Sequence, residues 1–110
     1  MREKAIIIAQ LASQKFAPDW HVEVKEMPKR YARDYWALVK KNMIVAGEKV
    51  ISRKAVIYIN FGDIGDEEKL TEAICHEVSH IYGDFNKKDE IKEYVKGELN
   101  REIQYEGYNY

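Results

Sequence analysis

The stretch "KAVIYINFGDIGDEEKLTEAICHEVSHIYG", residues 54–83, places a β-rich run, a glycine turn and a helical pattern in immediate succession. Its first part is rich in β-branched and aromatic residues, which predicts a strand that ends at Asn60. Asp66 is a suitable N-cap for the following helix, and Gly83 is a natural stop. A helical stripe joins these two ends and consists of Leu70, Ala73, Ile74, Val78 and Ile81.

The rest of the chain completes an α+β pattern around this segment. The order of elements predicts an N-terminal helix, three strands forming a small and mostly antiparallel sheet, the helix just described, and a second C-terminal helix. In order, these segments are a helix at 2–16, a strand at 20–27, a polar stretch at 28–34, two strands within 35–60, a helix at 90–103 and a tail at 104–110.

Length and composition limit the possible classes of protein. A chain of 110 residues predicts a single domain that spans residues 1–110. The formal net charge of −1 gives no electrostatic reason to expect a nucleic acid or an anionic membrane as partner. Cys75 is the only cysteine, which excludes an intrachain disulfide. The apolar stretch of the first helix is too short to span a bilayer, so we expect a cytoplasmic protein without a membrane segment.

Two of the three histidines, His76 and His80, are four residues apart in the predicted helix, and a glutamate follows the first of them. Residues at this spacing share a helix face, so both imidazoles can reach one zinc ion through Zn–N bonds of about 2.0–2.1 Å. Glu77 is rotated by about 100° around the helix axis, to the flank of that ion, where it can hold a water. The pattern therefore predicts a Zn2+ site in which Glu77 is the general base that activates this water.

Residues 54–97 resemble the zincin metallopeptidases, which carry H-E-x-x-H on a helix preceded by a β-rich strand. The chain is similar to the gluzincins, in which a downstream glutamate is the third ligand. In size it resembles the minigluzincins, which are themselves similar to the catalytic domains of membrane metallopeptidases of the CAAX prenyl protease type. The resemblance implies a zincin-like fold with an active-site helix and a C-terminal glutamate helix. It also implies that the strand at 54–61 lines the cleft and pairs with an extended substrate.

The third zinc ligand has to come from another part of the chain. The metzincin form H-E-x-x-H-x-x-G-x-x-H fails, since Asn86 stands where its third histidine is required. The segment 89–97, "DEIKEYVKG", resembles the gluzincin form N-E-x-x-x-D-x-x-G, in which Glu90 is the ligand, although Tyr94 stands where the supporting aspartate is expected. We therefore predict a site of His76, His80 and Glu90, with Glu93 or His21 as alternatives for the third position.

Several of these residues also have ordinary structural interpretations. Glu90 and Glu93 lie among lysines, so a solvated helix face with ion pairs explains them as well. Cys75 is expected to be a small buried residue rather than a ligand. Asp84 is either an acceptor for a histidine N–H or a polar residue at the end of a helix. The tail also holds tyrosines that either donate to an oxyanion or pack over a cleft, namely Tyr105, Tyr108 and Tyr110.

The sequence thus predicts a zinc-dependent endopeptidase that acts on a peptide or protein substrate. The resemblance to minigluzincins implies a latent form, a zymogen whose C-terminal segment, about residues 98–110, shields the site within one chain or across a homodimer. The alternative is a non-catalytic zinc-binding or regulatory domain with a peptidase-like fold, which the imperfect third-ligand region favours. A DNA-associated zincin is less well supported, since the chain has no basic arm and no zinc-ribbon cysteines.

Overall fold

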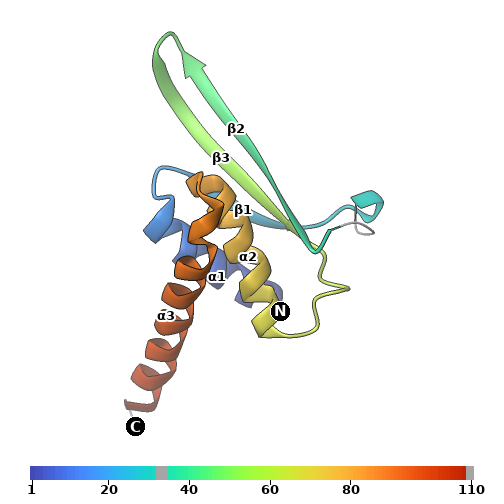
Figure 1. The fold of residues 1–110 in the computed structure, drawn as a ribbon, viewed down its shortest axis with the longest axis vertical. Helices are drawn as coiled ribbons and strands as arrows, with labels where there is room; N and C mark the ends of the chain where they lie inside the picture. The colour runs from blue at the N-terminus through green and yellow to red at the C-terminus, as the bar shows by residue number, and fades with distance from the viewer. Residues whose placement is uncertain (32–34, 109–110) are drawn as a thin grey trace.

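The strand and the capped helix predicted from residues 54–83 are both present. The computed structural model describes residues 1–31 and 35–108, with side chains described as far as Arg101. Strand β3 spans Lys49–Ile59, and helix α2 spans Glu67–Tyr82 (Figure 1). The Asp66 carboxylate caps α2 by accepting a hydrogen bond from the Lys69 backbone N–H at 2.7 Å. Gly83 ends the helix with a φ of 93°, a left-handed conformation that glycine adopts without steric cost.

The order of elements is also the predicted one. The described chain forms an α+β fold of three α-helices and a three-stranded sheet. The second C-terminal helix is longer than predicted, because it continues through residues that were expected to form an irregular tail. The remaining elements are α1 (Arg2–Phe16), β1 (His21–Glu26), η1 (Lys29–Tyr31), β2 (Ala37–Ala46), η2 (Phe85–Lys87) and α3 (Lys88–Tyr108).

The sheet differs from the mostly antiparallel arrangement that we expected. Its strand order is β1-β3-β2, so β3 lies between the other two strands. β2 pairs with β3 in antiparallel orientation, but β1 pairs with β3 in parallel, from His21 opposite Lys54 to Glu26 opposite Ile59. The sheet is therefore mixed. β1 and β2 follow each other in the sequence but do not pair as a hairpin. β3 pairs between them instead, and it runs in the same direction as β1.

The central position of β3 overturns one prediction about substrate binding. Residues 54–59 of β3 are paired with β1 on one side and with β2 on the other. Their backbone groups are already used in the sheet, so an extended peptide cannot add to this strand. The two edge strands are β1 and β2, and of these β2 contacts α2.

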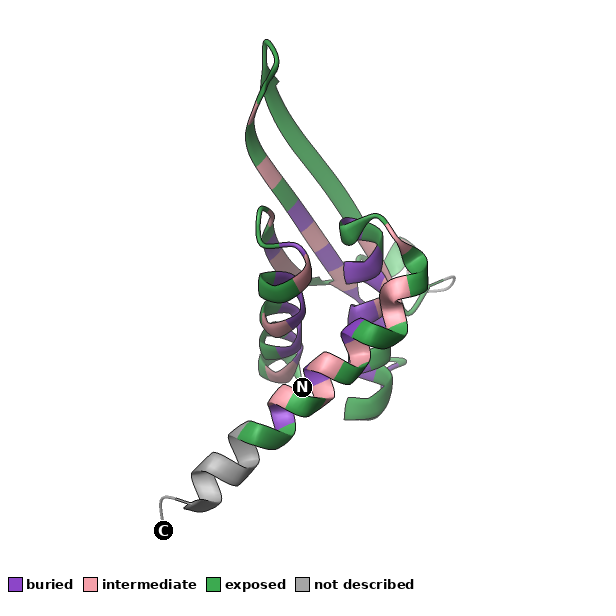
Figure 2. Ribbon diagram, turned by 60° about the vertical axis from the view of Figure 1, so that its left-hand side comes forward, coloured by how far each residue is buried: buried purple, intermediate pink, exposed green. Residues whose placement is uncertain are grey.

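The core lies between one face of the sheet and the three helices (Figure 2). Residues 55, 57 and 59 of β3 are buried, whereas residues 56 and 58 are only half-buried, as expected for a strand with one covered face. The helical stripe predicted on α2 is confirmed, since all five of its residues are buried. The other helices contribute buried apolar side chains at Ala5, Ile8, Ala9 and Ala12 of α1 and at Ile91, Val95 and Leu99 of α3.

Helix α3 runs antiparallel to α2 and is held to it by ion pairs on the surface. The Lys92 and Lys96 ammonium groups lie 3.1 and 2.8 Å from the Glu68 carboxylate. The first turn of α3 is consequently close to the C-terminal half of α2, which carries both predicted histidine ligands (Figure 1). Within residues 1–31 and 35–108, no helix combines the length and the apolar character needed to cross a membrane.

Candidate metal centre

His76 and His80 lie on one face of α2 with their rings adjacent. The two Nε2 atoms are 3.2 Å apart. Two nitrogen ligands of a tetrahedral zinc ion, with Zn–N bonds of about 2.0–2.1 Å, are themselves separated by about 3.3 Å. The separation in the protein therefore fits two ligands of one zinc ion. Without a metal, the same distance also allows a hydrogen bond in which one Nε2–H donates to the other ring.

Phe85, the first residue of η2, holds both imidazoles from the side. Its ring meets the His76 ring edge-on, with centroids 4.9 Å apart, and stacks on the His80 ring at 5.5 Å. Burial lowers the pKa of His76, and the nearby His80 and Lys88 lower it further, while Glu72 opposes them. His76 is therefore biased toward the neutral form, which is the form that binds metals.

Glu77 is the buried carboxylate of the site, with 7% of its surface exposed. Burial raises its pKa to about 7, although the Val39 backbone N–H of β2 donates a hydrogen bond to the carboxylate and opposes the shift. One carboxylate oxygen lies 4.0 Å from the His76 Nε2 atom. The carboxylate thus lies beside His76, and its pKa lies near neutrality.

A pocket of about 420 Å³ opens over His76 and Glu77. Its walls come from the start of β2 and from one side of α2, and they carry both aromatic and polar groups. Besides His76 and Glu77, the lining residues are Tyr35, Trp36, Ala37, Glu72 and Ala73. The imidazole and the carboxylate therefore face a space that a ligand can enter.

The predicted third ligand is not beside the histidines in this structure. The Glu90 side chain is exposed and lies 3.5 Å from the Lys87 ammonium group. Its neighbour Asp89 instead lines a recess of about 180 Å³ together with His76, Glu72, Lys88 and Lys92. Consecutive helical residues differ in direction by about 100°, which accounts for the different surroundings of residues 89 and 90. Glu90 as a ligand therefore stays a prediction.

The recess brings acidic groups near His76 without completing a ligand set. Glu72 precedes His76 by one helical turn and lies 3.8 Å from the Lys92 ammonium group. Within the part of the chain that the structure describes, no three His, Cys, Asp or Glu side chains meet at a point suited to a metal ion. The separation of the two Nε2 atoms is compatible with zinc, but no third ligand side chain among the described residues lies with them in this structure.

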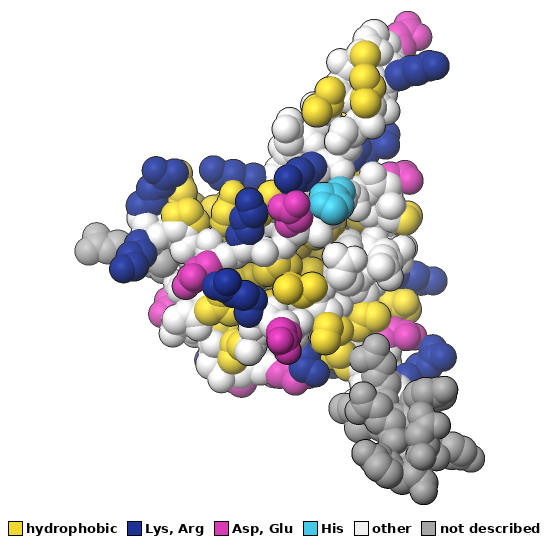
Figure 3. Space-filling model, turned by 180° about the vertical axis from the view of Figure 1, so that it is seen from behind, with side chains coloured by type: hydrophobic (Ala, Val, Ile, Leu, Met, Phe, Trp, Pro, Cys, Tyr) yellow, Lys and Arg dark blue, Asp and Glu magenta, His cyan; other side chains and the backbone are white. Residues whose placement is uncertain are grey.

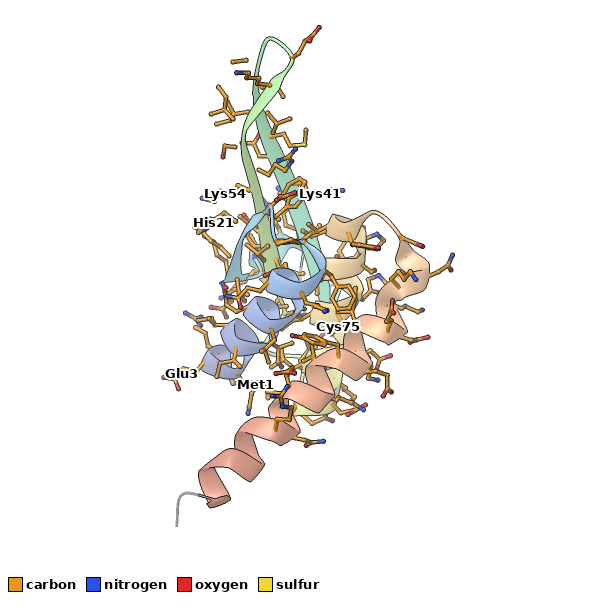
Figure 4. The ribbon with its side chains drawn as sticks, turned by 90° about the vertical axis from the view of Figure 1, so that its left-hand side faces the viewer. Met1, Glu3, His21, Lys41, Lys54 and Cys75 are labelled. Carbon is orange, nitrogen blue, oxygen red and sulfur yellow. The ribbon has the colours of Figure 1, made fainter. Side chains whose placement is uncertain are left out.

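The alternative ligand His21 lies far from the histidine pair. Its ring is exposed at the start of β1 and lies 3.3 Å from Glu23. Figure 4 shows His21 and Lys41 at opposite edges of the sheet, and the Lys41 ammonium group donates to the His80 backbone carbonyl at 3.1 Å. Because α2 lies at the Lys41 side, His21 is not brought together with His76 and His80. Glu93, the other alternative, is exposed on α3.

Cys75 and Asp84 have structural roles: Cys75 is a buried core residue, and Asp84 is a polar residue at the end of a helix. Cys75 is buried, and burial raises the pKa of its thiol to about 12, so it is an inert core residue (Figure 4). Asp84 caps η2 by accepting a hydrogen bond from the Asn86 backbone N–H at 3.0 Å. The side chains of Tyr105 and Tyr108 and the whole of Tyr110 lie outside the described residues.

The C-terminal segment begins at the opposite end of α2 from the histidines. Leu99 and Asn100 line a small surface recess with Glu67, Glu68 and Thr71, in the first turns of α2. From there α3 continues to Tyr108, away from the body of the protein (Figure 1). In this arrangement the helical part of the segment does not cover His76 in its own chain. Shielding of the site remains a prediction.

Sequence reasoning missed the residues that other elements bring to the site. Trp36, Tyr35 and Phe85 flank the histidines and Glu77, but nothing in their local pattern identifies them. The Val39 backbone N–H leaves no signal at all in a sequence. Glu72 could have been found, because it stands four residues before His76 on the same helix face.

Comparisons of the chain with protein-family models, with curated proteins and with solved structures gave no match. A function for this chain therefore has to be inferred from its residues and their geometry.

Proposed function

We propose that this chain is a zinc-dependent peptidase. The observation that carries the proposal is the 3.2 Å separation of the His76 and His80 Nε2 atoms beside a buried carboxylate. Two of the features that metal-assisted hydrolysis requires, a nitrogen pair and an adjacent carboxylate, lie on one helix. His76 and Glu77 also face a pocket that has room for a substrate group.

Each residue of the site has its own role in the proposed reaction. His76 and His80 would hold zinc, and a carboxylate from the first turn of α3 would complete the ligand set. When bound, zinc supplies the positive charge that lowers the pKa of a water and polarises a carbonyl group. Glu77 would accept the proton of the attacking water and then donate it to the leaving amine. Val39 keeps the Glu77 carboxylate oriented during both transfers.

The edge strand β2 is the proposed seat of the substrate backbone. β2 pairs with β3 along one side only, so backbone groups on its other side can pair with a peptide, apart from the Val39 N–H, which donates to Glu77. Ala37 lies on this edge and also lines the pocket over His76. A peptide that pairs with β2 would therefore pass beside His76.

The test is a metal titration with hydrolysis as the readout. Chelator-treated protein is mixed with a fluorescently labelled unfolded protein, and zinc is added stepwise. We expect hydrolysis to appear with zinc, to saturate near one zinc per chain, and to be about 10²–10⁴-fold slower in Glu77→Gln. Glu3→Gln is a matched control, because Glu3 is exposed in the first turn of α1 (Figure 4) and the adjacent Lys4 lies 3.8 Å from Glu67, at the opposite end of α2 from the histidine pair. Hydrolysis that persists after zinc removal would contradict the proposal.

A second candidate function is supported by the incomplete ligand set. Because no three ligand side chains converge within the described residues, zinc held by His76 and His80 could serve a binding or regulatory role without catalysis. In the same titration this function predicts stoichiometric zinc binding with no hydrolysis, both for the full chain and for a chain that ends at residue 101.

A further inference from the structure

The hairpin formed by β2 and β3 projects from the body of the protein. Its outer part, residues 40–54, is here called the free hairpin. Figures 1 and 2 show that it extends beyond the helices and that its surface is almost entirely exposed. Only Val50 and Arg53 are half-buried, and every other residue of the free hairpin is exposed. This surface has no covering element among the described residues.

Large apolar side chains gather near the end of the free hairpin (Figure 3). A projecting hairpin in water normally carries polar side chains on an uncovered face, because exposed apolar surface is unfavourable. Here four large apolar residues are about half exposed or more, namely Met43 (48%), Ile44 (54%), Val45 (53%) and Ile51 (66%). Both strands contribute these residues, and because successive strand residues point to opposite faces, apolar side chains are exposed on both faces of the free hairpin.

The free hairpin also carries an excess of positive charge. The free hairpin contains five basic residues against one acidic residue, a net charge of +4, whereas the whole chain has a formal charge of −1. The other 95 residues consequently carry a net charge of −5. The formal charge of the whole chain is therefore close to zero only because a positive free hairpin and a negative remainder nearly cancel. The charged residues of the free hairpin are Lys40, Lys41, Glu48, Lys49, Arg53 and Lys54.

Most of these positive charges have no carboxylate partner within the described residues. Lys54 lies 3.4 Å from Glu23. The Lys40 ammonium group lies over the rings of Tyr31 and Tyr58, and Lys41 donates to a backbone carbonyl, so neither charge is neutralised. Lys49 and Arg53 make no ion pair with a described residue. The free hairpin thus presents uncompensated cations next to exposed apolar side chains.

We propose that the free hairpin docks on an anionic lipid surface. The apolar residues of its outer part insert shallowly at the boundary between headgroups and acyl chains, and Lys49 and Arg53 contact lipid phosphates. Nucleic acid fits the free hairpin less well, because exposed apolar side chains such as Ile44 and Ile51 would lie against a phosphate backbone. Pairing with a second copy along β2 is opposed by Lys40 and Lys41 and by the β-bulge between Ile44 and Val45.

Cosedimentation of the full chain with vesicles tests this proposal without any metal. We expect binding to vesicles of phosphatidylcholine mixed with phosphatidylglycerol, little binding to phosphatidylcholine alone, and weaker binding as salt rises. The double variant Ile44→Ser/Ile51→Ser should lower binding about tenfold. Lys49→Glu/Arg53→Glu should lower binding by a similar factor and remove most of its salt dependence.

Matched controls make the same chemical changes outside the free hairpin. Ile6→Ser/Ile7→Ser removes two exposed isoleucines from α1, and Lys29→Glu/Arg30→Glu makes the same change of charge in η1. Both controls should bind like the unaltered chain, and thermal melts followed by circular dichroism verify that every variant is folded. The proposal is overturned if the unaltered chain does not bind anionic vesicles or if the controls lose binding equally. It also fails if duplex DNA binds the chain and the isoleucine changes leave that binding intact.

Discussion

The exposed face of α2 and the first turn of α3 contribute to the candidate site in different ways. On α2, the Nε2 atoms of His76 and His80 are 3.2 Å apart, a separation that fits two zinc ligands. On α3, Glu90 lies beside Lys87, while Asp89 shares a recess with His76. The geometry of one helix is therefore enough to place the two histidines together. The position of a third ligand depends also on how α2 and α3 pack and on the rotamer of its side chain.

The largest expected effect tests the catalytic part of the α2 face. Glu77→Gln removes the base but keeps the shape of the side chain and its position beside Val39. We expect hydrolysis to fall by about 10²–10⁴-fold with zinc affinity nearly unchanged, because Glu77 is not a ligand. Initial rates and zinc titrations of the same preparations measure both quantities. An unchanged rate would show that the carboxylate is not the base.

The second effect tests whether α2 holds the metal. His76→Ala and His80→Ala each remove one of two paired ligands, so each should lower zinc affinity by more than about 100-fold, beyond the usual cost of losing a supporting group. Competition with a chromogenic chelator measures the affinity. His21→Ala, on the opposite edge of the sheet, is the matched control and should bind zinc normally. If zinc affinity falls equally in all three variants, α2 is not the element that binds the metal.

The part of the site that the sequence predicted is the part that depends on local structure. The spacing of His76 and His80, the Asp66 cap and the Gly83 stop all follow from helical geometry within α2, and the structure contains each of them. The α+β order of elements was predictable for the same reason, since each element has its own periodicity.

The features that the sequence did not predict depend on contacts between distant segments. The insertion of β3 between β1 and β2 is set by strand pairing, which period-2 patterns do not specify. The Val39 hydrogen bond to Glu77 uses a backbone group, so no residue type marks it. The surroundings of Asp89 and Glu90 depend on the rotation of α3 against α2, and a shift by one residue changes which carboxylate is nearest His76.

A smaller effect separates the two carboxylates at the start of α3. Asp89 already lines the recess with His76, whereas Glu90 has Lys87 as its partner. We therefore expect Asp89→Asn to lower zinc affinity about tenfold and Glu90→Gln to lower it less. The same chelator competition compares the two variants. The reverse order would favour the glutamate selected by the gluzincin resemblance and would show that α3 rearranges when zinc binds.

The smallest effect concerns the metal-free protein and its dependence on pH. Burial raises the pKa of Glu77 from 4.5 to about 7, so the folded state binds this proton more tightly than the unfolded state does. The stability that comes from this proton is complete below pH 4.5 and is lost as the pH rises through about 7. Relative to the unaltered chain, Glu77→Gln should therefore gain up to about 3 kcal/mol of unfolding free energy between these pH values.

Urea denaturation at pH 4.5 and pH 8 measures this difference. Glu3→Gln is the control, because Glu3 is exposed on α1. If the curves of Glu77→Gln and of the unaltered chain stay parallel over this pH range, the carboxylate ionises freely in the folded state and is not buried as described.

X-ray absorption at the zinc edge, on chelator-treated protein reloaded with one equivalent of zinc, tests the central claim most directly. The account predicts two imidazole nitrogens at about 2.0–2.1 Å, with the remaining ligands oxygen, and loss of one imidazole in His80→Ala. A spectrum with no imidazole contribution, or with the same imidazole contribution in His80→Ala as in the unaltered chain, would contradict it.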